Sequence, residues 1–192
     1  MTEHAYHTAL GDRYEDFPAT NRVEHALGVA FVHDLADGIP EEMVNGADVF
    51  YADVPWAAGY EKFASRAGVA QKLKYRDFVE RLGKEIRLAG KPAVIVTGKH
   101  AVKHFAPDET AEVSLNGDKA IACLWGIASW PGRVKTEALI EMLAKRFNCV
   151  GDFCCGYGRS GRIFVQNGKT FIMSDLNAAC IGHIKHNIRH WQ

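Results

Sequence analysis

The sequence predicts an α/β protein with a doubly wound, mostly parallel sheet and helices on both faces. Short β-branched or aromatic runs alternate with segments whose apolar residues recur at helical spacing, which is typical of that architecture. Asn116 and Gly117 lie between two apolar runs, a pattern that favours a tight hairpin and therefore an antiparallel edge. With 192 residues, 47% of them hydrophobic, the chain is long enough for one sizeable core.

The predicted helices and strands follow from apolar spacing and from glycine and proline breaks. Val23, Leu27 and Phe31 recur at helical intervals, which predicts a first helix capped by Asn21. The expected helices are 21–37, 69–89, 135–147, one of unspecified length after residue 158, and 178–190. The expected strands are 48–52, 93–97, two strands flanking residues 116–117, 149–153, and 170–175.

Composition excludes several classes of protein. No apolar run approaches the ~20 residues of a membrane span. The acidic start lacks the basic-then-apolar pattern of a secretory signal, so we expect a soluble, cytoplasmic protein. The cysteines are odd in number and form no C-x-x-C pair, which favours reduced thiols over a disulfide or zinc framework: Cys123, Cys149, Cys154, Cys155 and Cys180.

Charge is unevenly distributed although the net charge is zero. Residues 1–53 contain two Arg against eleven acidic residues, whereas residues 54–104 contain eleven Lys and Arg against four. The second segment has two interpretations, a phosphate-binding surface or a solvated helix face. Its basic residues include Lys62, Arg66, Lys72, Lys74, Arg76, Arg81 and Lys84.

A glycine-rich stretch, "GDFCCGYGRSGR", follows the strand predicted at 149–153 and precedes a predicted helix. Spaced glycines at such a turn let the backbone approach a nucleotide, and Asp175, at the end of the next strand, suits ribose hydroxyls. Asp152 at the strand end would repel the pyrophosphate of a dinucleotide, so the stretch favours a cationic or hydroxyl-bearing ligand. A tight turn without a ligand is the alternative.

A second stretch, Asp53-Val54-Pro55-Trp56, follows the strand expected at 48–52. A carboxylate, a proline-restricted backbone and an indole suit a flat ring that carries an amino group. Asp53 can accept a hydrogen bond from the amino group, and Trp56 can stack on the ring. The alternative is that Asp53 caps a turn and Trp56 belongs to the core.

Together the two stretches resemble the S-adenosylmethionine-dependent amino methyltransferases of DNA, the N6-adenine and N4-cytosine group. That family carries (Asp/Asn/Ser)-Pro-Pro-(Tyr/Phe/Trp) and Asp-Pro-Phe-x-Gly-x-Gly; the matches here are residues 53–56 and 152–158. Val54 and Phe153 stand where the family has proline. The catalytic signature comes first, which resembles the permuted order of the β class, and the similarity spans roughly residues 48–190.

The resemblance implies a Rossmann-like methyltransferase fold in a single domain, 1–192. Its catalytic half would be about 40–130 and its cofactor-binding half about 131–192. The roughly 95 residues between the signatures hardly fit a full target-recognition domain. The family's next strand after Asp175 must come from elsewhere or be absent. Residues 29–35 are not expected to supply it because they are predicted helical.

The resemblance also implies residue roles. Asp53, with a backbone carbonyl near Val54 or Pro55, would accept both amino hydrogens, and Trp56 would hold the base. The residues implied for S-adenosyl-L-methionine are Asp152, Phe153, Cys154, Gly156 and Gly158 for its methionine and sugar, Asp175 for the ribose, and Lys135 for the methionyl carboxylate. The nucleic-acid backbone would follow the basic segment, beginning with Lys62, Arg66, Lys72 and Lys74.

The expected reaction is methyl transfer to an exocyclic amino group of a nucleobase, with adenine N6 in DNA favoured. An RNA adenosine N6 methyltransferase, a cofactor-binding subunit without catalysis and a nicotinamide-dependent oxidoreductase are the alternatives. A phage origin and a homodimer or a specificity partner are further expectations. His183, His186 and His190 share one helix face, either as metal ligands or as a cationic stripe; we expect no metal and no membrane association.

Overall fold

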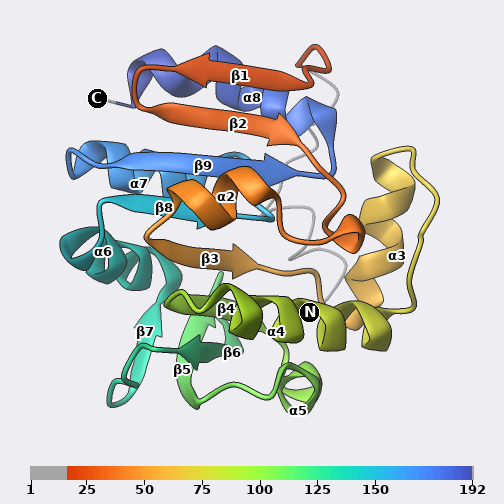
Figure 1. Ribbon diagram of the computed structural model, residues 1–192, viewed down its shortest axis with the longest axis vertical. Coiled ribbons are helices and arrows are strands. Elements are labelled where there is room, and N and C mark those ends of the chain that lie inside the picture. The colour runs from red at the N-terminus through yellow and green to blue at the C-terminus, as the bar shows by residue number, and fades with distance from the viewer. Residues whose placement is uncertain (1–16, 192) are drawn as a thin grey trace.

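The computed structural model describes residues 17–191, apart from the side chain of Ala58. Within these residues nine strands form one sheet in the order β1-β2-β9-β8-β3-β4-β6-β5-β7 (Figure 1). The strands are β1 (Arg22–His25), β2 (Gly28–Val32), β3 (Val49–Asp53), β4 (Ala93–Thr97), β5 (Glu109–Leu115), β6 (Asp118–Trp125), β7 (Arg133–Lys135), β8 (Cys149–Asp152) and β9 (Thr170–Asp175).

The centre of the sheet is parallel and its flanks contain antiparallel pairs. Strands β2, β9, β8, β3 and β4 run in one direction, while β1 pairs antiparallel with β2, and β6 with both β4 and β5. All five residues of β4 are buried, as expected for a strand covered on both faces. The predicted doubly wound sheet with an antiparallel hairpin near one edge is therefore confirmed.

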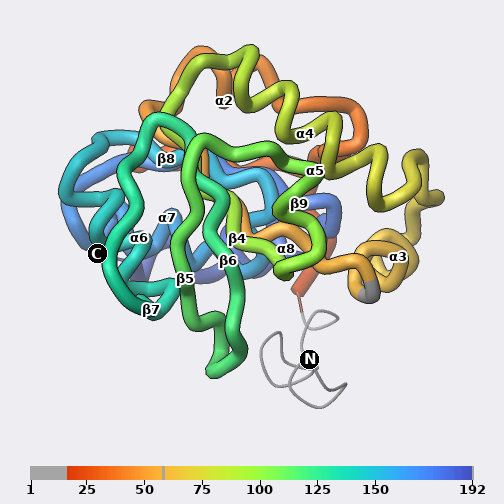
Figure 2. Tube along the Cα trace, turned by 90° about the horizontal axis from the view of Figure 1, so that it is seen from below, coloured from red at the N-terminus to blue at the C-terminus, as the bar shows by residue number. Residues whose placement is uncertain are grey.

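Helices cover both faces of the sheet. The helices are α2 (Glu41–Gly46), α3 (Ala57–Arg66), α4 (Tyr75–Ala89), α5 (Val102–Phe105), α6 (Thr136–Arg146), α7 (Arg159–Gln166) and α8 (Ala178–Asn187), with short 3-10 turns η2 (Leu35–Asp37), η3 (Lys99–Ala101) and η4 (Ile188–His190). Figure 2 shows α2 and α4 on one side of the sheet and α6, α7 and α8 on the other. One core cluster lies under each group.

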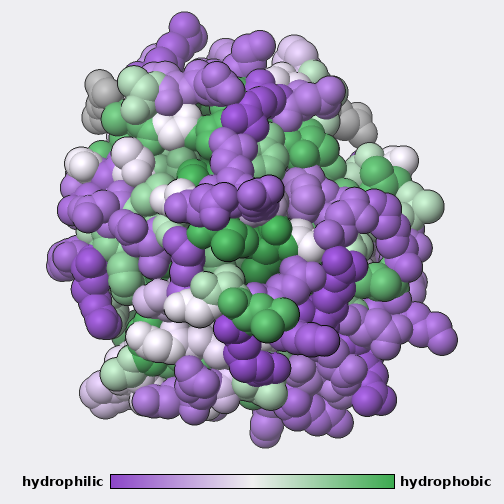
Figure 3. All heavy atoms as spheres, in the orientation of Figure 1, coloured by the Kyte–Doolittle hydropathy of each residue, from purple (hydrophilic) through white to green (hydrophobic). Residues whose placement is uncertain are grey.

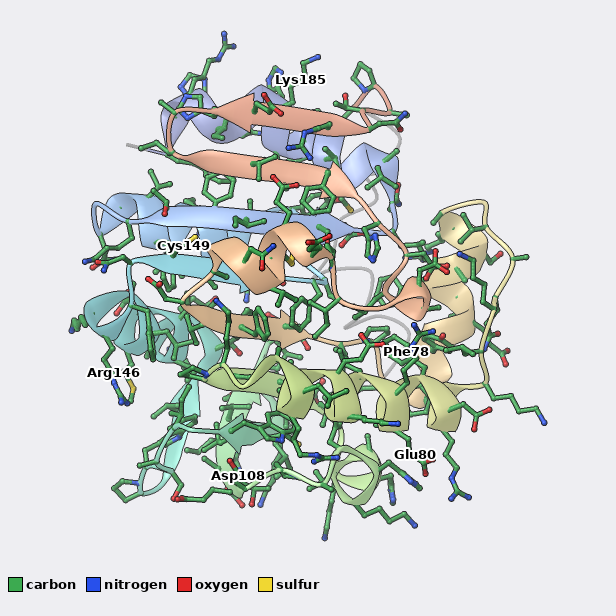
Figure 4. All side chains as sticks on the ribbon, viewed as in Figure 1. Phe78, Glu80, Asp108, Arg146, Cys149 and Lys185 are labelled. Carbon is green, nitrogen blue, oxygen red and sulfur yellow. The ribbon has the colours of Figure 1, made fainter. Side chains whose placement is uncertain are left out.

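Helix α4 illustrates how the outer layer is built. Its buried residues include Phe78, Val79 and Leu82, which recur at helical spacing and face the sheet. Glu80 lies on the opposite side of the helix, away from the sheet (Figure 4). Hydrophilic side chains cover much of the face that carries α2 and α4 (Figure 3). No described helix is long and apolar enough to cross a membrane.

The helix predicted over 21–37 is wrong: this segment forms the hairpin of β1 and β2. Val23 pairs with Ala30 across the hairpin, and the backbone carbonyl of Asn21 accepts a bond from the Val32 amide (2.8 Å) instead of capping a helix. Val29 and Val32 favour strand, and parallel pairing of β2 with β9 outweighs the helical spacing. Strand β2 therefore lies next to β9 and supplies the strand that follows Asp175 in the family. The expectation that residues 29–35 would not supply this strand is wrong.

The other differences are smaller. Helix α4 begins at Tyr75, so residues 69–74 of the predicted helix form a loop, and α3 precedes them without having been predicted. The helix predicted over 178–190 ends at Asn187 and continues as η4. The remaining predicted strands and the helix before β8 form close to the expected bounds.

Gly28→Ala should destabilise the protein, because a methyl group there would lie 2.1 Å from the backbone oxygen of Phe171. Separating β2 from β9 to relieve that overlap is expected to cost about 2 kcal/mol of unfolding free energy. Thermal unfolding should show this as a melting temperature lower by about 4–8 °C. Leu88→Ala, at a side chain that is 76% exposed on α4, is the control and should change little. Equal melting temperatures for the two variants would contradict the β2–β9 register.

Candidate active site

A cavity of about 260 Å³ lies at the carboxyl ends of the central parallel strands, where ligands bind in sheets of this type. The end of β3 contributes three residues that the sequence marked as catalytic: Asp53, Pro55 and Trp56. The ends of β8 and β9 and the loop after β8 contribute five that it marked for the cofactor: Asp152, Phe153, Cys154, Gly156 and Asp175. The fold therefore brings the two signature stretches, distant in the chain, to one cavity.

Backbone bonds hold the Asp53–Trp56 corner. Asp53 is the last residue of β3, and the Val54 amide still donates to the Val96 carbonyl of β4 (3.2 Å). Val54 is 1% exposed and packs in the core under α2 and α4. A proline at this position has no N–H to donate, so valine adds a bond that the family's proline cannot make.

Trp56 is fixed from two sides. Its carbonyl oxygen accepts bonds from the amides of Gly59 (2.6 Å) and Tyr60 (3.0 Å) at the start of α3. Its indole lies against Gly98, where a Cβ would come within 3.3 Å of the ring. The indole therefore has a defined place in the cavity wall.

Acidic side chains shape the glycine loop. The Asp152 carboxylate accepts bonds from the Cys154 amide (3.1 Å) and from the Ser160 hydroxyl. Asp175 accepts from the Gly156 amide (2.8 Å) and, with its other oxygen, from the Asn177 amide (2.9 Å). Gly156 has φ +50° and open space where a side chain would be, so the loop exposes backbone to the cavity at this point.

The cavity is electrostatically acidic. Burial raises the pKa of Asp53 from its ordinary value of 3.8 to about 7, and the Arg159 cation opposes this shift. Burial also raises the pKa of Asp152 to about 7. The hydrogen bonds from Ser160 and Cys154 lower this pKa, while repulsion from Asp175 and Asp53 raises it further. The pKa of Asp175 is raised by burial too. Such a site favours a ligand that carries positive charge.

Burial raises the pKa of the Cys154 thiol well above its ordinary range, with neighbouring carboxylates adding to the effect. The thiol therefore stays protonated at neutral pH and is a poor nucleophile. Cys154 contributes to the wall of the cavity rather than to covalent chemistry.

Two of the residues predicted for the cofactor do not line the cavity. A Cβ on Gly158 would lie 2.7 Å from the Trp191 ring, so this glycine serves the close packing of the loop on the C-terminal segment. Lys135 is exposed at the end of β7, and its neighbour Thr136 lines the cavity instead. Thr136 donates its hydroxyl hydrogen to the Ser114 carbonyl (3.0 Å).

The four residues predicted for nucleic acid divide into two pairs. Arg66 and Lys72 line the cavity, whereas Lys62 and Lys74 do not. Lys72 forms ion pairs with Asp34 (3.1 Å) and Asp37 (2.6 Å), so its charge is already balanced inside the chain. This pairing ties the loop between α3 and α4 to η2.

The cavity also contains residues that the sequence analysis did not select. His33 and Asp34 follow β2, the strand mistaken for a helix; a correct strand assignment would have placed them at the carboxyl edge. Asp34 caps η2 through the Ala36 amide (2.9 Å), and His33 Nε2 contacts the Gly38 carbonyl (2.7 Å). Arg159, whose charge opposes the rise in the pKa of Asp53, is the first residue of α7. Leu115 and Asn116 come from the β5–β6 hairpin.

The histidines of α8 do not gather a metal-ligand set. Within the described residues no group of three or more His, Cys, Asp or Glu side chains is placed to hold an ion. The His183 ring instead packs on Tyr157 (centroids 4.4 Å apart) and on Phe17 (4.8 Å).

No known family model and no curated protein sequence matches this chain. Solved structures do match it. The structure of M1.HpyAVI in complex with SAM superposes with a TM-score of 0.55 at 13% sequence identity. The match covers 84% of this chain and 98% of that chain. TTHA0409 of Thermus thermophilus, described as a candidate DNA modification methylase, has a TM-score of 0.54 at 14% identity, covering 88% and 96%. At these identities the similarity concerns the fold, and the chain has the Rossmann-like methyltransferase fold.

Proposed function

We propose that this protein transfers a methyl group from S-adenosyl-L-methionine to an exocyclic amino group of a nucleobase in DNA, with adenine N6 as the target. The observation that supports this most directly is the shared cavity of the Asp53–Trp56 corner and the glycine loop. A fold neighbour that binds SAM supports the choice of cofactor. The resemblance of residues 53–56 to the amino methyltransferase signature supports the choice of reaction.

The residues of the glycine loop fit such a cofactor. S-adenosylmethionine carries a sulfonium cation, an ammonium group and two ribose hydroxyls, and the carboxylates of buried Asp152 and half-buried Asp175 match these groups. The Asp175 oxygens accept backbone bonds from Gly156 and Asn177, which orient the carboxylate in the cavity wall. The open space at Gly156 lets the ligand approach the backbone. When bound, the cofactor supplies an electrophilic methyl group.

The Asp53–Trp56 corner supplies the transition-state interactions. The lone pair of a ring amino group is delocalised, so hydrogen bonds that favour a pyramidal nitrogen accelerate attack. Asp53 is the acceptor for one amino hydrogen, and a backbone carbonyl at Val54 or Pro55 is the acceptor for the other. The Val54–Val96 bond fixes the backbone that carries this carbonyl.

Trp56 is the stacking surface for the target base. Stacking on an aromatic side chain is worth about 1–3 kcal/mol per base. A purine offers a larger overlap than a pyrimidine, which agrees with adenine as the target. A base within a duplex cannot reach this cavity, so the target base must be extruded or already unpaired.

Asp53→Ala should reduce kcat for methyl transfer by about 10²–10³-fold, because the acceptor for an amino hydrogen is lost. Asp53→Asn retains one neutral acceptor oxygen and should lose only about 10-fold. Radiolabelled methyl incorporation into DNA measures both. Binding of S-adenosylmethionine, measured by calorimetry, should be nearly unchanged in the two variants. Full turnover by Asp53→Ala would remove Asp53 from the mechanism.

Turnover at saturating cofactor should rise with pH, because Asp53 accepts hydrogen bonds best as a carboxylate and burial raises its pKa to about 7 in the protein without ligand. The bound sulfonium cation lowers this pKa, so the ascending limb should lie below about pH 7. Asp53→Asn cannot ionise, so its profile should lose this limb. An ascending limb at the same pH in wild type and Asp53→Asn would contradict Asp53 as the titrating acceptor.

S-adenosylmethionine should raise the melting temperature, whereas NAD, the cofactor of the competing oxidoreductase hypothesis, should not. Ligand at 100 times its dissociation constant adds about 2.7 kcal/mol of stability, which corresponds to about 5–10 °C here. Asp175→Asn should weaken this binding about 10-fold by loss of a charged acceptor for ribose. Asp77→Asn, on the exposed surface of α4, is the matched control. Stabilisation by NAD alone would favour the oxidoreductase.

Nucleoside mass spectrometry of DNA and RNA from cells that express the protein identifies the target. We expect N6-methyladenine in DNA that is absent with Asp53→Ala. N4-methylcytosine would change the base assignment, and N6-methyladenosine confined to RNA would favour the RNA methyltransferase. No methylated nucleoside in either pool would favour the non-catalytic subunit.

A further inference from the structure

Three basic side chains gather at the end of the sheet formed by β6, β5 and β7. Lys119 of β6 lies opposite Ser114 of β5, and Lys135 of β7 lies opposite the same serine from the other side. Arg133 lies opposite Glu112, two residues earlier on β5. We call Lys119, Arg133 and Lys135 the basic row.

The basic row faces away from the core. Along β5, Val113 and Leu115 are buried, so the alternate residues Glu112 and Ser114 point to the other face. Side chains that pair on that face are exposed: Lys119 is 55% exposed and Arg133 is 44% exposed. Lys135 is exposed as well.

The basic row borders the cavity. Leu115 and Asn116, directly after Ser114, line the cavity, and so does Thr136, directly after Lys135. Figure 2 shows the β5–β6 hairpin extending beyond the body of the molecule in the lower part of the view. Lys135, and Ser114 opposite Lys119, are therefore next in sequence to residues of the cavity wall.

The charge of this row is only partly balanced. Glu112 forms an ion pair with Lys119 and lies 3.7 Å from Arg133. In residues 17–191 no acidic side chain pairs with Lys135. In the basic segment that the sequence suggested for phosphate, Lys72, Arg76 and Arg81 have acidic partners within the chain. The basic row and Arg66, which lines the cavity, therefore carry positive charge near the site.

We propose that the basic row binds the phosphate backbone of the nucleic acid whose base occupies the cavity. This inference rests on the proposed function for its choice of partner. Neighbouring strands are about 4.8 Å apart, so the backbones of Lys119 and Lys135 are about 10 Å apart and their long side chains can reach successive phosphates of one strand. Lys135 then acts on the nucleic acid and not on the methionyl carboxylate.

The test is the salt dependence of oligonucleotide binding, measured by fluorescence anisotropy with a labelled duplex and a labelled single strand. Lys119→Gln/Lys135→Gln is compared with Lys145→Gln/Lys185→Gln, which changes net charge equally at exposed lysines of α6 and α8. Losing two phosphate contacts should reduce the slope of log K against log salt by about 1.8 for the duplex and about 1.4 for the single strand. The control pair should keep the wild-type slope.

The single variant Lys135→Gln breaks no ion pair within the described residues. Unlike the double variant, it keeps the Lys119–Glu112 contact, so a change in binding cannot come from losing that contact. It should reduce the duplex slope by about 0.9 and leave the dissociation constant for S-adenosylmethionine unchanged. A tenfold weaker affinity for S-adenosylmethionine with an unchanged slope would overturn the inference and support the role at the methionyl carboxylate.

Failure of the proposed function and failure of this inference give different results. Wild-type slopes in all variants, with methyl transfer to DNA intact, would overturn the basic row alone. Reduced slopes without methyl transfer to any nucleic acid would support the basic row and count against the catalytic proposal. No binding of wild-type protein to either oligonucleotide would overturn the inference and the choice of a nucleic-acid substrate.

Discussion

The parallel pairing of β3 with β8 is the contact on which the site depends. Tyr51 lies opposite Asp152, so the chain leaves β3 at Asp53 close to where it leaves β8 for the glycine loop. Pairing of β8 with β9, in which Asp152 lies opposite Met173, then brings Asp175 to the same edge. Three carboxylates from three adjacent strands meet because parallel strands end together, and desolvation raises the pKa of each.

The sequence predicted strands that are buried on both faces, such as residues 93–97, because a short β-branched run after a glycine and proline break favours strand over helix. The prediction was wrong for β2, because Val23, Leu27 and Phe31 follow helical spacing. The interaction that makes this segment a strand is its pairing with β9, which is remote in the chain. The same error concealed His33 and Asp34. Local pattern identified the acidic residues at strand ends, but the packing of Gly158 against Trp191 has no local signal.

Val54 shows why a departure from a motif needs the structure. From the motif alone, replacing the first proline suggests a looser loop. In the fold, the valine amide extends the β3–β4 ladder by one bond and its side chain fills the core, so the corner that carries Asp53 and Trp56 is held by other means. The backbone at this position is held by the hydrogen bond from Val54 to Val96 of β4 rather than by the fixed φ of a proline.

The position of β2 has a consequence for biosynthesis. This strand is near the start of the chain, yet one of its neighbours, β9, is near the end, with Gly28 opposite Phe171. The edge of the ligand cleft formed by residues 33 and 34 therefore cannot assemble until residues 170–175 have left the ribosome. Such long-range pairing slows folding, and the nascent chain must keep the β1–β2 hairpin from pairing elsewhere until its partner is made.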